Sequence, residues 1–299
     1  LNTLFNNDTE LIDKIKHIFV FPNIEMRLNH FVGRNSENID FHVIFSDEIP
    51  IELIEENFIK KLEFVFDTPI GNSADKRSIS PMNIKLFGEK LKREQGFDGD
   101  DLVVGYKHVS LDINDIINVL QGISDFKDKY LTVVDDDNLG MIPWNGRDHN
   151  IRKTIVKRSN LQFSNNKSNI EWGLGLRGYK TPEEFLVEFG HYLPSITGSD
   201  AHTYDKMFIL DNGQHCWVKA NANFEGLRQI IFEPFERVKI QTTKPEEKNG
   251  DKVIDRIEIK DPNFSSEPIY FSENLTCIIG GKSTGKSLLL REIAKTIDK

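Results

Sequence analysis

Residues 275–287 read LTCIIGGKSTGKS, and this stretch decides the fold of the last part of the chain. The apolar run Leu275–Ile279 predicts a buried strand. Gly280–Ser287 then fits the pattern G-x-x-x-x-G-K-[ST] at every fixed position. Leu289, Ile293 and Ile297 follow at helical spacing, so the sequence predicts a strand, a phosphate-binding loop and a helix in that order.

The residue types of this loop suit the binding of a nucleoside triphosphate. Glycines let the backbone turn tightly, so that successive N–H groups point at phosphate oxygens, and the following helix adds its positive end. Lys286 would meet the β- and γ-phosphates as the catalytic lysine, and Ser287 would hold Mg²⁺. A plain glycine-rich turn is the alternative. We expect ATP and Mg²⁺ as cofactors and P-loop ATPase activity, with the nucleotide bound by Gly280, Gly281, Lys282, Ser283, Thr284, Gly285, Lys286 and Ser287.

Composition limits the remaining classes. The chain has 299 residues, 38% of them hydrophobic and 28% charged, which is typical of a globular protein. Its net charge of −9 excludes a general nucleic-acid coat, so a nucleic-acid contact needs a local basic patch. Two cysteines favour a reducing cytoplasm over a disulfide framework, and no apolar run approaches the ~18 residues of a membrane span. Because the chain begins at Leu1 and no second acidic strand follows the loop, we expect a piece truncated at both ends.

The remainder of the chain predicts an α/β fold. Expected strands and helices alternate, which favours a mostly parallel sheet with its chemistry at the carboxyl ends of the strands. The Lys-, Glu- and Gly-rich stretch 242–251 reads as a linker, so we expect two domains, 1–244 and 245–299. Strands are expected at Phe19–Arg27 (ending at Glu25), Ile39–Phe45, Tyr130–Val134, Leu161–Ser164, Leu193–Thr197, Arg237–Ile240, Val253–Ile259 and Pro268–Phe271, and helices at Leu53–Phe66, Ile84–Glu94, Asp112–Gly122, Asn150–Arg158, from Thr181 and at Asn223–Phe232.

Asp200 and His202, in the sequence GSDAH, form a second candidate site. An acid and a histidine two residues apart after a strand can enter one pocket, and carboxylate with imidazole suits zinc, manganese or iron. A capped turn is the alternative explanation of the same residues.

Several segments resemble known families. GSDAH resembles the end of PHP (polymerase and histidinol phosphatase) domains, which are (β/α) barrels of metal-dependent phosphoesterases. FPNIEMRL and IDFHVIF resemble that family's strands with a ligand Glu and a ligand His. The resemblance implies the metal ligands Glu25, His42, Asp200 and His202, with the last two also catalytic. WVKANANFEGLRQIIFEPFERV resembles the stretch that joins a PHP domain to an ATPase in TrlF-like proteins, and LTCIIGGKSTGKSLLLREIAKTI resembles the start of SMC-like and ABC-type ATPase heads.

The chain also departs from the PHP pattern. The family's leading His-x-His motif is absent, and Asp135–Asp137 takes the place of its late Ala-His-Pro strand end. These acids either replace the histidine as oxygen ligands or form a solvated turn. The basic residues between 147 and 158 are either a phosphate-backbone contact or an ordinary helix face, and His149 is expected in a polar loop.

Taken together, the resemblances imply a partial PHP-like barrel followed by the first strands and P-loop helix of an SMC/ABC-like head. The expected function is an ATPase coupled to a metal-dependent phosphoesterase or nuclease that acts on DNA, in repair or phage defence. The expected protein is cytoplasmic, outside the membrane and dimeric through its ATPase heads. Two alternatives stay open, namely an ATPase with a catalytically dead PHP binding module, and a nucleotide-regulated small-molecule phosphoesterase.

Overall fold

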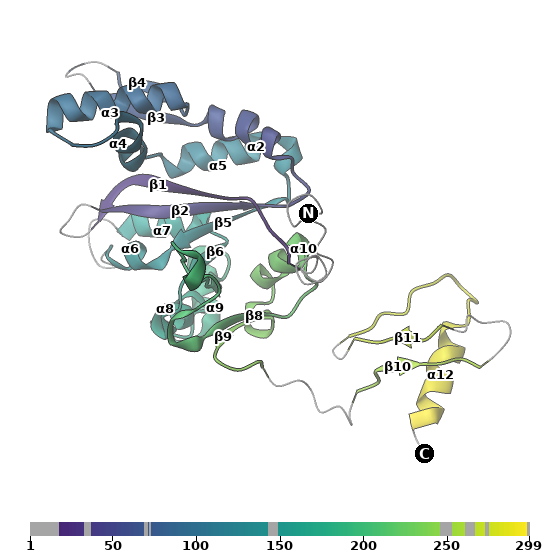
Figure 1. The fold of residues 1–299 in the computed structure, drawn as a ribbon. Helices are drawn as coiled ribbons and strands as arrows, with labels where there is room; N and C mark the ends of the chain where they lie inside the picture. Colours follow the sequence, from purple (N-terminus) through teal and green to yellow (C-terminus); the bar gives the residue numbers. More distant parts are fainter. Residues whose placement is uncertain are drawn as a thin grey trace. The chain divides into compact units, whose positions relative to one another are not determined.

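A five-stranded mixed sheet organises the first part of the chain (Figure 1). In this computed structural model, residues 18–32, 37–68, 71, 73–142, 149–245, 253–260, 267–272 and 275–297 are described. The chain divides into two compact units, the first covering Leu1–Thr243 and the second Lys244–Lys299. No helix among the described residues is long and apolar enough to cross a membrane.

The sheet has the order β1-β2-β5-β6-β7 and is open, with β1 and β7 at its edges. β1 and β5 both run antiparallel to β2, whereas β5, β6 and β7 are parallel to one another. The expectation of a mostly parallel sheet was therefore wrong for β1 and β2. The strands of this sheet are β1 Asn23–Val32, β2 Glu37–Phe45, β5 Tyr130–Asp135, β6 Leu161–Phe163 and β7 Ser195–Ile196.

Alternation along the strands gives the sheet two different faces. One face carries Met26, Leu28, Phe41, Phe45 and Val134, all buried in the larger core. Figure 1 shows α2 and α5 on one side of β1 and β2, and both helices contribute apolar side chains to this core.

The opposite face of the sheet is apolar over only part of its area. Ile44, Val133, Leu161 and Ile196 pack there against Phe224 and other residues of the segment around α10 in a second, smaller core. Glu25, Arg27, Asp40 and His42 occupy the same face on β1 and β2, because they alternate with the core residues of those strands.

Helices and two small two-stranded sheets make up the rest of the described first unit. Its helices are α2 Ile51–Asn57, α3 Pro81–Gln95, α4 Asp101–His108, α5 Ile113–Gly122, α6 Asp136–Gly140, α7 His149–Arg158, α8 Lys167–Gly173, α9 Pro182–Phe189, α10 Phe224–Arg228 and α11 Pro234–Arg237. Its 3₁₀ helices are η1 Ile59–Lys61, η2 Ser124–Phe126, η3 Tyr204–Lys206, η4 Asp211–Gly213 and η5 Gln229–Ile231. Two further antiparallel pairs join β3 Glu63–Asp67 with β4 Asp75–Ser78, and β8 His215–Val218 with β9 Val238–Gln241.

Two expected elements of the first unit differ in the structure. The helix expected over Leu53–Phe66 ends at Asn57, and Glu63–Asp67 forms β3 because β4 pairs with it. Glu25 was expected at a strand end, but it is the third residue of β1, which continues to Val32 along β2.

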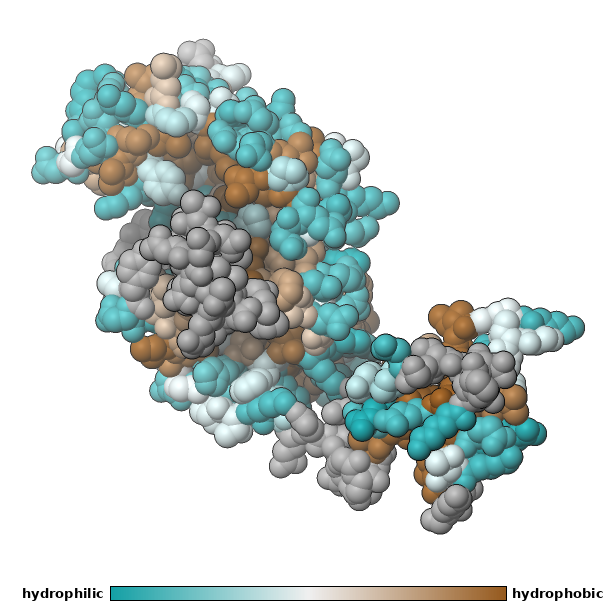
Figure 2. Space-filling model, turned by 45° about the vertical axis from the view of Figure 1, so that its right-hand side comes forward, coloured by the Kyte–Doolittle hydropathy of each residue, from teal (hydrophilic) through white to brown (hydrophobic). Residues whose placement is uncertain are grey.

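Within its described residues, the second unit has two short paired strands and one helix. β10 Arg256–Ile257 pairs antiparallel with β11 Ile269–Tyr270, and α12 covers Lys286–Ile297. The strand expected over Leu275–Ile279 is not formed, and the end residues of this stretch are 75% and 92% exposed, respectively. A strand needs a partner, and within the described residues β10 and β11 pair only with each other. No residue of α12 is buried, and apolar side chains remain at the surface of this unit (Figure 2).

Candidate nucleotide and metal sites

The glycine-rich loop closes around the side chain of Lys286, the first residue of α12. The Lys286 ammonium donates to the carbonyl oxygens of Gly280 at 2.5 Å and Gly281 at 2.6 Å. Thr284 Oγ1 donates to the Gly281 carbonyl at 2.9 Å. The lysine side chain therefore spans the loop from the start of the helix to the first two glycines. The helix predicted after the loop is confirmed as α12.

Backbone conformation explains why this loop needs glycine. Ser283 and Gly285 have φ values of +66° and +84°, and this left-handed region suits glycine best. Left-handed residues next to right-handed ones turn successive N–H groups toward one point, which is the geometry of an anion nest. A Cβ atom on Gly280 would lie 2.8 Å from Thr284 Oγ1, so a larger residue would push this threonine away from the loop.

Glu25 and His42 form the centre of the candidate metal site. They are register partners on β1 and β2, so their side chains lie side by side on the same face of the sheet. His42 is 9% exposed, accepts a hydrogen bond at Nδ1 from Asn23 Nδ2 at 3.2 Å, and meets the edge of Phe163 with ring centroids 4.9 Å apart. The imidazole is thus held in one orientation by β1 and β6.

The pKa of His42 responds to the charge of a residue that is distant in sequence, Asp200. Burial lowers the pKa of His42, while the negative charges of Glu25 and Asp200 act to raise it. Asp200 therefore lies within electrostatic reach of His42, although nearly 160 residues separate them in sequence. His202 Nε2 is 3.7 Å from Asp200 Oδ2, and both side chains are exposed.

These four residues do not make a complete metal shell in the structure. Within the described ranges, no three His, Cys, Asp or Glu side chains are grouped closely enough to hold a metal ion. The structure brings Glu25 beside His42 and Asp200 beside His202. The assignment of all four as metal ligands stays a prediction.

Sequence reasoning missed two residues at this site, Arg27 and Asp40. Both lie beside Glu25 and His42, because Arg27 pairs with Asp40 in the register between β1 and β2. Burial raises the pKa of Asp40, although the positive charge of Arg27 acts to lower it. Counting two residues along each strand from Glu25 and from His42 would have found both.

The acidic run after β5 has a structural role. Asp135 ends β5, and Asp136 begins α6, where it is buried and accepts a hydrogen bond from Asn169 Nδ2 at 2.7 Å. The solvated turn considered for this run was therefore wrong for Asp136. The side chain of Asp137 lies outside the described residues.

The basic stretch before β6 is also engaged within the fold. Lys153 pairs with Glu188 at 2.9 Å, and the Arg152 guanidinium lies over Trp172 and donates to a backbone carbonyl. His149 begins α7 instead of lying in a loop, and Arg147 lies outside the described residues. These contacts favour the ordinary helix face for the part of this stretch that is described.

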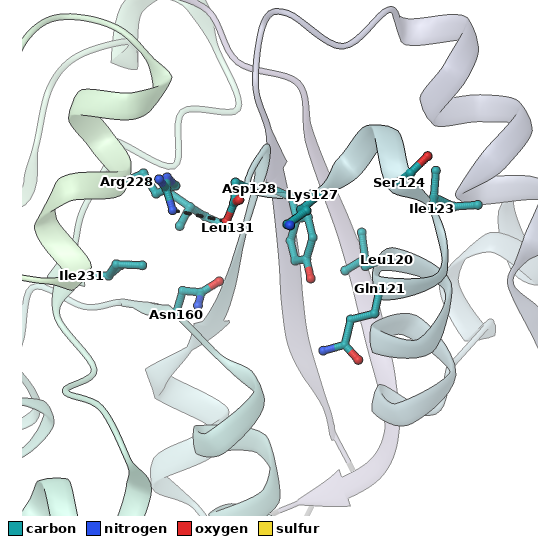
Figure 3. A pocket seen from close by; sticks show the side chains of 11 residues that line it. Leu120, Gln121, Ile123, Ser124, Lys127, Asp128, Leu131, Asn160, Arg228 and Ile231 are labelled. Carbon is teal, nitrogen blue, oxygen red and sulfur yellow. Dashed lines mark ion pairs between the residues drawn. The ribbon is translucent and has the colours of Figure 1, made fainter.

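A separate cavity of about 470 Å³ lies between α5 and the segment around α10 (Figure 3). Arg228 enters it but pairs with Asp128 at 3.5 Å and with Glu225 at 2.8 Å. None of the candidate ligands lines this cavity. Arg228 donates to Glu225 from both Nε and Nη2, so this face of its guanidinium is already hydrogen-bonded.

Comparisons of the chain with protein-family models, with curated proteins and with solved structures found no match. What these residues do must therefore be inferred from their chemistry and geometry.

The lowered pKa of His42 predicts a loss of stability in acid. Unfolding returns the ring to its ordinary pKa of about 6.5, so below that pH the unfolded state binds a proton that the folded state resists. The free energy of unfolding should fall as the pH drops from about 6.5 toward the lower folded value. Urea unfolding in a chelator at several pH values measures this. The fall should be smaller for His42→Asn, and an equal fall in both proteins would contradict the prediction.

Proposed function

We propose that this chain combines a P-loop nucleotide site with a PHP-like, metal-dependent phosphoesterase site that acts on nucleic acid. The observation that carries the proposal is the loop, in which Lys286 begins a helix and lies across the glycines that precede it. The residue types of this loop and the left-handed backbone of Ser283 and Gly285 support phosphate binding, and ATP with Mg²⁺ is the ligand that we propose.

Glu25 and His42 support the phosphoesterase part of the proposal. They offer an oxygen and a nitrogen donor from neighbouring strands, which suits Zn²⁺, Mn²⁺ or Fe²⁺. The hydrogen bond that Nδ1 accepts from Asn23 fixes the orientation of the His42 ring. A metal bound at Nε2 would need the ring proton on Nδ1, and that nitrogen would then donate its hydrogen bond instead of accepting one. Asp200 and His202 would complete the ligand set from the segment after β7.

The chemistry of such a site is hydrolysis of a phosphoester. A bound divalent metal supplies an acidified water and neutralises charge on the phosphoryl oxygens. The protein's own residues then orient the ester. ATP binding at the second unit would pair two heads of a homodimer and control access of a DNA phosphodiester to the metal site.

A nuclease assay on the purified protein tests this function. With Mn²⁺, cleavage of DNA or RNA should be lost by roughly 100-fold or more in His42→Asn and Asp200→Asn, because losing a ligand should cost more than the 10–100-fold typical of outer-shell partners. Metal content measured in parallel should fall in both variants. Full metal occupancy without cleavage would favour the dead binding module instead.

A second substrate separates the remaining alternative. p-Nitrophenyl phosphate, assayed under the same conditions, reports hydrolysis of small phosphomonoesters. Turnover of this ester without cleavage of any nucleic acid would favour a nucleotide-regulated small-molecule phosphoesterase.

A further inference from the structure

Arg27 lies beside the candidate ligands Glu25 and His42 and has no partner within hydrogen-bond distance among the described residues. Its Nη2 is 3.8 Å from Glu25 Oε1, and its Nε is 3.8 Å from Asp40 Oδ1. Both distances exceed the range of a hydrogen bond. The guanidinium therefore sits between two carboxylates, and its N–H groups remain available to another acceptor.

The Asp40 carboxylate, on one side of this guanidinium, also lacks a hydrogen-bond partner at one of its described oxygens. Asp40 Oδ1 is buried and has no hydrogen-bond partner in the part of the chain that the structure describes, although buried polar atoms in folded proteins usually have one. Arg27 is 34% exposed at its side chain, so it is reachable from outside while Asp40 holds it near the sheet. The Arg27 guanidinium is therefore held only weakly by Glu25 and Asp40, and an added anion can replace either carboxylate as its partner.

The register places this cation next to the proposed chemistry. Arg27 is two residues from Glu25 on β1 and pairs with Asp40, which is two residues from His42 on β2. We propose that Arg27 binds the phosphoryl oxygens of the substrate at the metal site, which defines the substrate as a phosphate ester anion. This inference rests on the proposed function.

The chemistry of arginine supports this role. Guanidinium is always charged, and its planar fork matches two phosphate oxygens at once. Two loose ion pairs at 3.8 Å, both partly exposed to water, are weak competitors for it. A phosphate ester held by a metal ion would present its remaining oxygens to Arg27.

Binding of inorganic phosphate tests the inference without catalysis. Calorimetry with Mn²⁺-loaded protein should show roughly tenfold or weaker phosphate binding in Arg27→Gln, because a charge-assisted hydrogen bond is lost. Asp40→Asn should bind phosphate more tightly than wild type, because it removes a competitor for Arg27. Arg93→Gln is the matched control, since Arg93 is 72% exposed on α3 beside Glu94, and the substitution changes the net charge equally.

The outcomes distinguish this inference from the proposed function. Phosphate affinity in Arg27→Gln equal to wild type, or a wild type that binds no phosphate, would overturn the role of Arg27. Phosphate binding that depends on Arg27, in a protein that hydrolyses no ester, would support the role and count against the phosphoesterase. Thermal unfolding midpoints close to wild type in both variants ensure that binding is compared between folded proteins.

Discussion

Lys286→Ala should bind MgATP about 100-fold more weakly than the wild type, a loss of roughly 3 kcal/mol. The ammonium now bonded to the carbonyls of Gly280 and Gly281 is the group that would meet the β- and γ-phosphates. Alanine removes this charge and also the contacts that tie the helix start to the loop. Calorimetry with magnesium present measures the change.

Lys295→Ala provides the matched control. Lys295 lies on the same helix as Lys286, is 60% exposed and pairs with Glu292, and it lies outside the phosphate-binding motif. It should therefore retain ATP affinity within a few-fold of wild type. Unchanged ATP affinity in Lys286→Ala would show that the loop is not the nucleotide site.

Elements with strong local signals could be predicted from the sequence. Asp112 caps α5 by accepting from the Asn114 N–H at 2.8 Å, and Thr181 with Pro182 marks the start of α9. Each of these signals lies within a few residues of the helix that it begins. The helix after the loop was predictable for the same reason, because Gly285 and the spacing of Leu289 and Ile293 are local.

Elements that depend on distant partners were not predictable in this way. Residues 63–66 belong to the stretch that was expected to be helical, yet Glu63–Asp67 forms a strand because residues 75–78 pair with it. Leu275–Ile279 has the composition of a strand but remains unpaired in the part of the chain that the structure describes. Pairing between segments decides a strand, and composition alone does not show it.

The candidate metal site could be predicted from the sequence only in part, for the same reason. Glu25 and His42 were identified by resemblance, and the register that sets them side by side came from the structure. Arg27 and Asp40 belong to no sequence motif, and only that register shows that they lie beside Glu25 and His42. The electrostatic link between Asp200 and His42 depends on a crossover that no local pattern encodes.

Gly88→Ala should destabilise the first unit by about 2 kcal/mol. Gly88 on α3 packs against α4, and an added Cβ would lie 1.8 Å from the Asp101 carbonyl oxygen. A Cβ atom added to Gly105 on α4 would likewise lie 2.0 Å from the Ile84 carbonyl oxygen. The two helices therefore approach each other closely at both glycines. Overpacking of this kind costs about 3 kcal/mol, which exceeds the roughly 1 kcal/mol that alanine gains over glycine inside a helix. Urea unfolding measures the net effect.

Gly122→Ala is the control for this prediction. Gly122 is the last residue of α5, and an added Cβ would meet no atom within 4 Å. This substitution should therefore be neutral or stabilise by up to about 1 kcal/mol, because it only restricts the unfolded chain. The difference in sign between the two variants isolates the close approach of α3 and α4 from the general effect of replacing glycine. A Gly88→Ala protein as stable as Gly122→Ala would mean that the helices separate without cost, so that their contact does not depend on glycine.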